Sequence, residues 1–133
     1  MDRLISLMTM LLWASNVQAE TPMTAAEFDA YVTGKTLTFD TPGGDFYGVE
    51  QYRKDRQVVW QAEGGPCVEG VWFEKGGNIC FLYETDPEPK CWAVFKTKDG
   101  IRAEFQNRPG TPPITETLTE SQPLSCPEPE LLG

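Results

Sequence analysis

The sequence contains no histidine, and this absence removes most of the familiar active sites. A Ser-His-Asp triad, a Cys-His nucleophile and an imidazole metal ligand all need that residue. The chain also has no Cys-x-x-Cys redox pair, and none of its paired glycines is followed by the Lys-Ser or Lys-Thr of a phosphate-binding loop. Any catalysis would have to use carboxylates, tyrosines or lysines, and we expect no cofactor.

No apolar stretch is long enough to cross a membrane. The longest one, residues 4–14, is about half of the roughly 20 residues that a spanning helix needs. It follows a positively charged start and precedes small residues at Val17 and Ala19, which is the pattern of a cleavable secretory signal. An uncleaved membrane anchor is the alternative. We expect a signal peptide over residues 1–19 and a single β-rich domain over 20–133, periplasmic or secreted and not inserted in a membrane.

Positive charge is scarce, because 11 Lys and Arg residues stand against 20 Asp and Glu residues, for a net charge of −9. An acidic protein is repelled by phosphate backbones and by anionic lipid, so we expect no nucleic-acid partner and no membrane-surface partner. The charge is typical of a soluble exported protein and would also suit a basic partner. An unidentified periplasmic protein or a small ligand is therefore the expected partner.

Turn-forming residue pairs recur through the middle of the chain at the spacing of an antiparallel meander, roughly every ten residues. They are Gly43-Gly44, Lys54-Asp55, Gly64-Gly65, Gly76-Gly77, Asp86-Pro87 and Asp99-Gly100. The segments between them predict strands over residues 35–39, 45–52, 57–63, 67–73, 78–83, 91–96 and 101–105. Gly48 and Gly70 fall inside these strands, where glycine often marks a bulge or a bend.

The expected fold is therefore mainly β, an antiparallel meander of seven to eight strands over residues 35–106. It should form a small barrel or a strongly curved sheet, because closure removes open strand edges. The tail, residues 109–133, is rich in proline and should be extended and irregular. At most a short strand is expected in the tail, around 114–119.

One short helix is expected before the meander, over residues 24–33. Thr24 and Glu27 have the spacing of a capping box at its start, and Gly34 follows its end. An apolar stripe at helical spacing should dock this helix on the sheet, plugging one end. The stripe consists of Phe28, Tyr31 and Val32.

Four cysteines allow three disulfide pairings. Cys80 and Cys91 flank one predicted hairpin, and a turn at Asp86-Pro87 would place them almost opposite each other, within disulfide range. The remaining pair, Cys67 and Cys126, would tie the tail back to the meander. A redox pair or a metal site is the alternative, but the spacing fits no zinc motif. The two disulfides would place the domain in an oxidising compartment.

Carboxylates within or beside the predicted strands are the candidates for acid–base chemistry. An inward-facing pair could do glycosidase-type work if the separation were suitable. The simpler interpretation is that all of them are exposed strand positions, and we favour it. The candidates are Glu50, Glu69 and Glu74.

A second carboxylate group alternates through one predicted loop and could offer oxygen ligands to Ca²⁺. It lacks the glycine and the ligand spacing of an EF-hand loop. We therefore favour an acidic, solvated turn and expect no metal site. The group consists of Glu84, Asp86 and Glu88.

The predicted strands are rich in aromatic residues. These could line a cavity for a small apolar ligand, as in larger eight-stranded barrels. In a domain of this size we instead expect them to fill the core. They are Tyr47, Tyr52, Trp60, Trp72, Phe73, Phe81, Tyr83, Trp92 and Phe95.

Several segments of the chain together resemble a group of small exported proteobacterial proteins of unknown function. The resemblance runs from the helix to Trp92 and implies a periplasmic, disulfide-bonded β-domain, but it carries no activity and no functional residue. The segments are Met23-Thr24-Ala25-Ala26-Glu27-Phe28, Tyr31-Val32-Thr33-Gly34-Lys35-Thr36-Leu37, Tyr47-Gly48-Val49-Glu50-Gln51-Tyr52, Cys67-Val68-Glu69-Gly70-Val71-Trp72, Ile79-Cys80-Phe81-Leu82-Tyr83-Glu84 and Cys91-Trp92.

The leading functional hypothesis is a non-catalytic exported β-domain that binds a protein or a small ligand, with unknown binding residues. The alternative is a protein inhibitor of an exported hydrolase, since an acidic face steers toward a basic enzyme. A hydrolase that works through carboxylates is the third hypothesis. We expect no enzymatic activity, because the sequence has no recognisable catalytic constellation.

Overall fold

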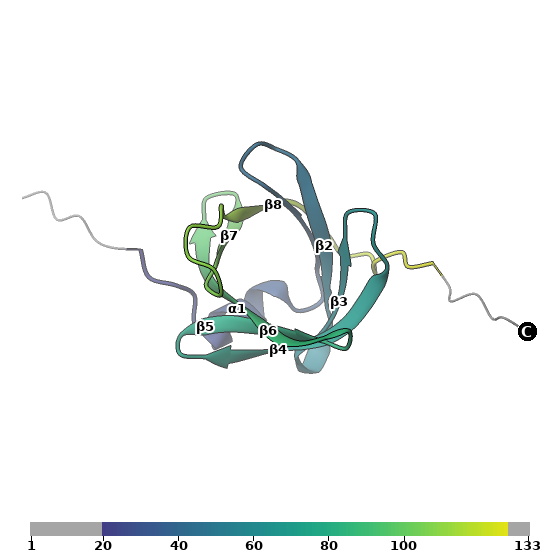
Figure 1. Ribbon diagram of the computed structural model, residues 1–133, viewed down its shortest axis with the longest axis horizontal. Helices are drawn as coiled ribbons and strands as arrows, with labels where there is room; N and C mark the ends of the chain where they lie inside the picture. The colour runs from purple at the N-terminus through teal and green to yellow at the C-terminus, as the bar shows by residue number, and fades with distance from the viewer. Residues whose placement is uncertain (1–19, 128–133) are drawn as a thin grey trace, which may run out of the picture.

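The computed structural model describes residues 20–127, and within them eight antiparallel strands close into a barrel. The strands follow one another around the barrel in sequence order, and β8 returns to pair with β1. Figure 1 looks through the ring that the strands form. The predicted fold is confirmed, and the closed barrel is the form that it takes. The predicted signal peptide, residues 1–19, and the end of the tail, 128–133, lie outside the described residues.

The observed strands match the predicted ones to within a residue or two, except that β6 begins earlier. Helix α1 (Ala25–Val32) precedes the strands, and a turn of 3-10 helix, η1 (Lys54–Arg56), joins β2 to β3. The strands are β1 (Thr36–Asp40), β2 (Phe46–Tyr52), β3 (Gln57–Ala62), β4 (Cys67–Lys75), β5 (Asn78–Tyr83), β6 (Asp86–Thr97), β7 (Gly100–Phe105) and β8 (Ile114–Glu120).

Side chains alternate between the interior and the exterior of the barrel, as the pleat of a strand requires. In β7, Ile101 and Ala103 are buried, whereas Arg102 and Glu104 remain partly exposed. Buried side chains of the strands, together with Met23 and two residues of α1, form one apolar interior. Its buried members are Met23, Phe28, Val32, Leu37, Phe39, Tyr52, Val58, Trp72, Ile79, Phe81, Val94, Ile101, Ala103 and Ile114.

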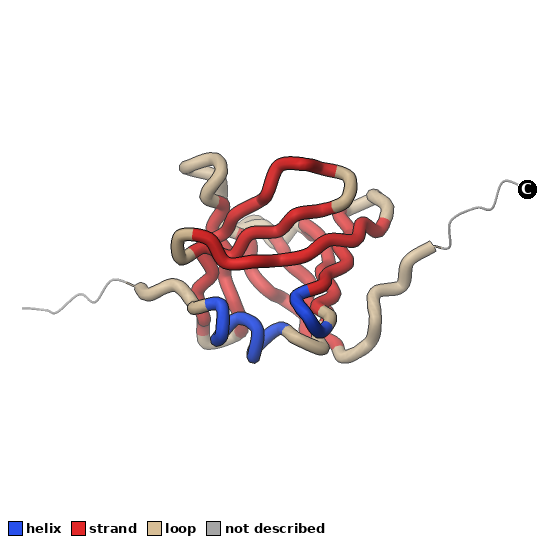
Figure 2. The backbone as a smooth tube through the Cα atoms, turned by 90° about the horizontal axis from the view of Figure 1, so that it is seen from below, coloured by secondary structure: helices blue, strands red, loops and turns tan. Residues whose placement is uncertain are grey.

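Helix α1 closes one end of the barrel, where Figure 2 shows it lying against the strand ends. The capping box is present, since the Glu27 amide donates to Thr24 Oγ1 at 3.1 Å and the Thr24 amide donates to Glu27 Oε1 at 3.0 Å. Phe28 is 1% exposed and meets three barrel rings edge to face, with a centroid distance of 5.0 Å to Trp72. The other two rings are Tyr52 and Phe81. Such edge-to-face packing fixes the helix as a plug.

The turn predicted at Asp86-Pro87 is wrong by two residues. Tyr83 pairs with Asp86, so the chain reverses at residues 84–85 and β6 begins at Asp86. The register then shifts between Phe81 and Tyr83. Proline has no N–H to give to the ladder, so Pro87 and Pro89 favour an irregular stretch of strand there.

Both disulfides predicted from the sequence are present. Cys80 lies directly opposite Cys91 in the β5–β6 ladder and is bonded to it. The two cysteines still face each other although the turn is displaced, because the register shifts between Phe81 and Tyr83. Cys67, at the start of β4, is bonded to Cys126 in the tail. Two structural disulfides indicate an oxidising, non-cytoplasmic location.

The tail is held against the barrel after β8 ends. Thr36 Oγ1 donates to the Gln122 carbonyl at 2.7 Å, and the Leu124 amide donates to Gln51 Oε1 at 3.2 Å. These contacts carry the tail past β1 and β2 toward its disulfide on β4. Neither described helix has the length and apolarity that crossing a bilayer demands.

Candidate functional site

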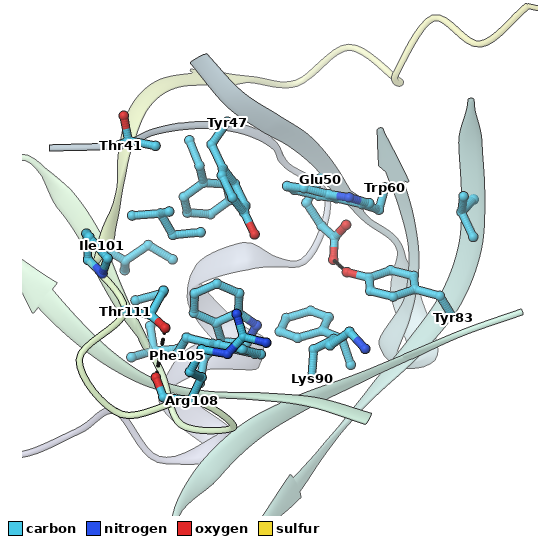
Figure 3. Close-up of a pocket in the computed structure, with 18 of the residues that line it drawn as sticks. Thr41, Tyr47, Glu50, Trp60, Tyr83, Lys90, Ile101, Phe105, Arg108 and Thr111 are labelled. Atoms are coloured by element: carbon cyan, nitrogen blue, oxygen red, sulfur yellow. Dashed lines mark hydrogen bonds between the residues drawn. The ribbon is translucent and has the colours of Figure 1, made fainter. Parts of the chain in front are cut away.

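The barrel holds a cavity of about 890 Å³. Phe28 of α1 forms part of its floor, and its rim includes residues 41–43 of the β1–β2 loop and Arg108 and Thr111 of the β7–β8 loop. Concave, mostly apolar spaces of this size are typical ligand sites. Figure 3 shows the side chains that point into the cavity.

Aromatic rings form much of the cavity wall. The Tyr47 ring lies 5.6 Å from the Trp60 ring and 6.5 Å from the Trp92 ring, between centroids. The Trp92 ring in turn lies 4.8 Å from the Phe105 ring. Apolar side chains of β6, β7 and β8 complete the wall, among them Val94, Ile101, Ala103 and Ile114.

Two glycines inside strands make room for this wall. A Cβ at Gly48 would overlap the Trp60 ring, which lies close to the bare backbone. A Cβ at Gly70 would lie 2.6 Å from the Leu82 carbonyl oxygen and 2.7 Å from Cδ1 of Tyr83. The bend predicted at Gly48 matches a register shift between β1 and β2 beside it, whereas Gly70 lies in a continuous register. Both glycines therefore serve close approach of an aromatic ring.

Glu50 is the main polar feature of the cavity interior. It lies on β2, opposite Trp60 of β3, and is 2% exposed. Its Oε1 accepts a hydrogen bond of 2.8 Å from the Tyr83 hydroxyl, and its Oε2 has no partner among the described residues. Burial raises the pKa of Glu50 well above its ordinary value, and the bond from Tyr83 opposes that rise only in part.

The pKa values of the tyrosines around Glu50 are raised as well. Burial, and then the charge and hydrogen bond of Glu50, raise the pKa of Tyr83 well above its usual range. Burial and the same charge raise the pKa of Tyr47. Both hydroxyls therefore stay protonated at neutral pH, and Tyr83 acts as a donor to Glu50.

The cavity rim carries charged groups. Lys90 Nζ donates to Asp86 Oδ2 at 2.6 Å, and this ion pair lowers the pKa of Asp86. Arg108 lies on the β7–β8 loop, and Figure 3 shows Lys90 and Arg108 across the cavity from Glu50 and Tyr47. Arg108 and the Lys90–Asp86 ion pair therefore lie on one side of the cavity, and the buried carboxylic acid lies at the opposite wall.

A second buried carboxylate, Glu116 of β8, is fully engaged elsewhere. Its Oε1 accepts from the Tyr31 hydroxyl at 2.8 Å and from the Ile101 amide at 3.1 Å, and its Oε2 accepts from Thr119. Burial, and then the hydrogen bond to Glu116, raise the pKa of Tyr31 to about 12. Glu116 thus ties α1 to β7 and β8 and is a structural group.

The three carboxylates singled out for acid–base chemistry do not converge. Glu50 points into the barrel, so its expected exposure is wrong. Glu69 is exposed and lies 3.7 Å from Arg53 in an ion pair. Glu74 is exposed and accepts a bond from the Gly77 amide at 3.0 Å. The structure therefore leaves Glu50 alone of this set in the cavity.

The acidic group considered as possible Ca²⁺ ligands is dispersed. Asp86 is bonded to Lys90, Glu88 Oε1 accepts from Asn107 Nδ2 at 3.1 Å, and Glu84 is exposed. Within residues 20–127, no cluster of three or more acidic or cysteine side chains is arranged to hold a metal ion.

The expectation that the aromatic residues only fill the core is wrong for part of the set. Trp72 does fill it, at 2% exposed. Phe73 and Phe95 point outward, and the Arg102 guanidinium lies 4.8 Å from the centroid of the Phe95 ring. The others line the cavity: Tyr47, Tyr52, Trp60, Phe81, Tyr83 and Trp92.

Several cavity residues were not identified from the sequence. Lys90 falls in a segment predicted to be a loop, and Arg108 falls in a segment without a predicted element. Phe105 did carry a signal, since it alternates with Arg102 and Glu104 on the predicted β7 strand.

Comparison with known proteins adds nothing to these assignments, because no protein family, curated protein or solved structure matches the chain.

Proposed function

We propose that the protein is an exported, non-catalytic binding domain that holds a small, largely apolar ligand inside its barrel. The observation that carries this proposal is the cavity of about 890 Å³, walled by aromatic and aliphatic side chains around one buried carboxylic acid. In a mostly apolar pocket, a small number of polar groups fixes the orientation of the ligand. The signal-like start of the sequence and the two disulfides support the periplasm, or secretion, as the place of binding.

Binding is favoured over hydrolysis by the placement of the acids. A carboxylate mechanism for glycoside cleavage needs two carboxyl groups that face one substrate. Among the residues described as lining the cavity, the acids are Glu50 and Asp86, and Asp86 is bonded to Lys90. The inhibitor hypothesis has the net charge as its support, so ligand binding is the stronger proposal.

A fluorescent apolar probe tests the proposal. N-phenyl-1-naphthylamine should bind the protein saturably, near one to one, and should accept excitation energy from Trp60 and Trp92 in the wall. Ala103→Phe fills part of the cavity and should weaken binding by at least about tenfold, because a packed site has no room for the added ring.

The matched control is Val71→Phe, which adds the same kind of ring at an outward position that is 44% exposed. It should bind the probe as the unaltered protein does. Equal probe binding by both variants, with unchanged folding, would place the probe outside the barrel and contradict the proposal.

A further inference from the structure

We propose that the ligand carries a cationic group, an ammonium or quaternary ammonium, and that Glu50 and the aromatic rings beside it bind this group. The inference rests on the proposed function and names the chemistry of its ligand. It comes from one buried carboxyl group with an unused oxygen and from the rings that surround it.

Glu50 has no positive partner in the described structure. None of the ion pairs among residues 20–127 involves it, and its hydrogen bond comes from a neutral phenol. A carboxyl group that is 2% exposed is costly unless it is paired or kept neutral. Oε2, which has no partner, is the atom at which a ligand could supply the missing charge.

The rings beside Glu50 also favour a cation. Trp60 lies directly across from it in the β2–β3 ladder, and Tyr83 is in hydrogen-bond contact with it. The Tyr47 ring lies 5.6 Å from the Trp60 ring, and Figure 3 shows both on the Glu50 side of the cavity. Aromatic faces attract ammonium groups, and the attraction grows when water is excluded.

The other charged groups around the cavity orient such a ligand. Lys90 is neutralised by Asp86 at 2.6 Å, whereas Arg108 has no ion-pair partner among the described residues. Arg108 lies across the cavity from Glu50 (Figure 3). A cationic head is therefore repelled from the Arg108 side of the rim and attracted toward Glu50, with its apolar body along the remaining wall.

Displacement of the bound probe by three compounds that each carry an eight-carbon chain tests this inference. Octyltrimethylammonium, 1-octanol and octyl sulfate share a chain and differ in charge. In the exported, disulfide-bonded protein, the ammonium compound should displace N-phenyl-1-naphthylamine at a concentration at least about tenfold lower than either of the others. In Glu50→Gln, which keeps the size and an acceptor for Tyr83, the preference over octanol should vanish.

The pH dependence gives a second readout that needs no variant. Binding a permanent cation requires Glu50 to lose its proton, so affinity for octyltrimethylammonium should rise with pH and level off once Glu50 is ionised. The tyrosines that face Glu50 are Tyr47, Tyr52 and Tyr83, and they stay neutral over this range. Affinity for octanol should lack this rise, whose maximum slope is tenfold for each pH unit.

The outcomes separate the two proposals. If the probe does not bind at all, the proposed function and this inference both fail. If the probe binds but octanol displaces it as well as the ammonium compound does, and both have the same pH profile, only the cationic ligand is overturned. An ammonium preference that persists in a folded Glu50→Gln protein would also overturn it.

Discussion

Tyr83 of β5 donates a 2.8 Å hydrogen bond to Oε1 of Glu50 on β2, so the two residues meet inside the barrel from strands that are not neighbours. The bond occupies one oxygen of the carboxyl group, and the other oxygen, Oε2, has no hydrogen-bond partner among the described residues.

The pH dependence of stability should carry the signature of Glu50. Its pKa is raised in the folded protein, so the folded state holds this proton more tightly than the unfolded state does. The stabilising contribution is complete below the ordinary pKa of about 4.3 and is lost as pH rises toward the folded value. Glu50→Gln cannot ionise, so its stability should lack this loss.

Thermal and urea unfolding of both proteins between pH 4 and pH 9 would measure the effect. The free energy of unfolding of Glu50→Gln minus that of the unaltered protein should grow as pH rises. Each tenfold increase in the proton affinity of the folded state is worth about 1.4 kcal/mol. A difference that is constant across this range would show that Glu50 titrates normally.

Gly48→Ala should destabilise the protein and disturb the cavity. The added methyl would overlap the Trp60 ring and lie 2.9 Å from the Gln61 carbonyl oxygen, so the ring must move. Overpacking of this kind costs about 1–3 kcal/mol. The change should appear both in the urea midpoint and in weaker binding of the naphthylamine probe.

Gly65→Ala is the matched control for Gly48→Ala. A Cβ at Gly65 would meet its closest atom at 3.5 Å, an ordinary contact. This variant should keep the stability and probe affinity of the unaltered protein. Equal effects of the two alanine substitutions would contradict the packing of Trp60 on Gly48.

The two disulfides should differ in what they contribute to stability. Cys67 and Cys126 are 59 residues apart, and Cys80 and Cys91 are 11 apart. On the loop-entropy argument, closing these loops is worth about 4 and about 3 kcal/mol, respectively. The Cys67→Ala, Cys126→Ala double variant should therefore lose more stability than the Cys80→Ala, Cys91→Ala variant.

Urea unfolding under non-reducing conditions measures the order, and peptide mapping verifies the bonds. Protein made without residues 1–19, and so kept in the reducing cytosol, should lack both bonds. A peptide that links Cys80 to Cys67 or Cys126 in exported protein would refute the pairing.

The helix and most of the strands could be predicted because the sequence patterns that mark them are local. The capping box at Thr24, the glycine turns and the alternation of Ile101, Ala103 and Phe105 each act within a few residues. The disulfides could be predicted because Cys80 and Cys91 needed only a hairpin. The exact turn could not, since the proline-rich stretch after Asp86 allowed an irregular ladder that shifts the register.

The cavity could not be predicted, because its polar groups are placed by tertiary structure. Glu50 looks like an exposed strand residue because it is charged, although it shares the buried side of β2 with Gly48 and Tyr52. A polar residue at an inward position then reads as a solvent-facing one. Arg108 reaches the mouth only because closure of the barrel brings the β7–β8 loop there.

The most direct test of the central claim is to locate an apolar ligand by NMR. Methyl groups of Val94, Ile101 and Ile114 face the cavity, whereas those of Val71, Leu82 and Leu118 are exposed on the outside. At saturating N-phenyl-1-naphthylamine, the first group should shift and show contacts to the probe, and the second should stay in place. Shifts confined to the outer methyl groups, or none at all, would contradict a ligand-binding barrel.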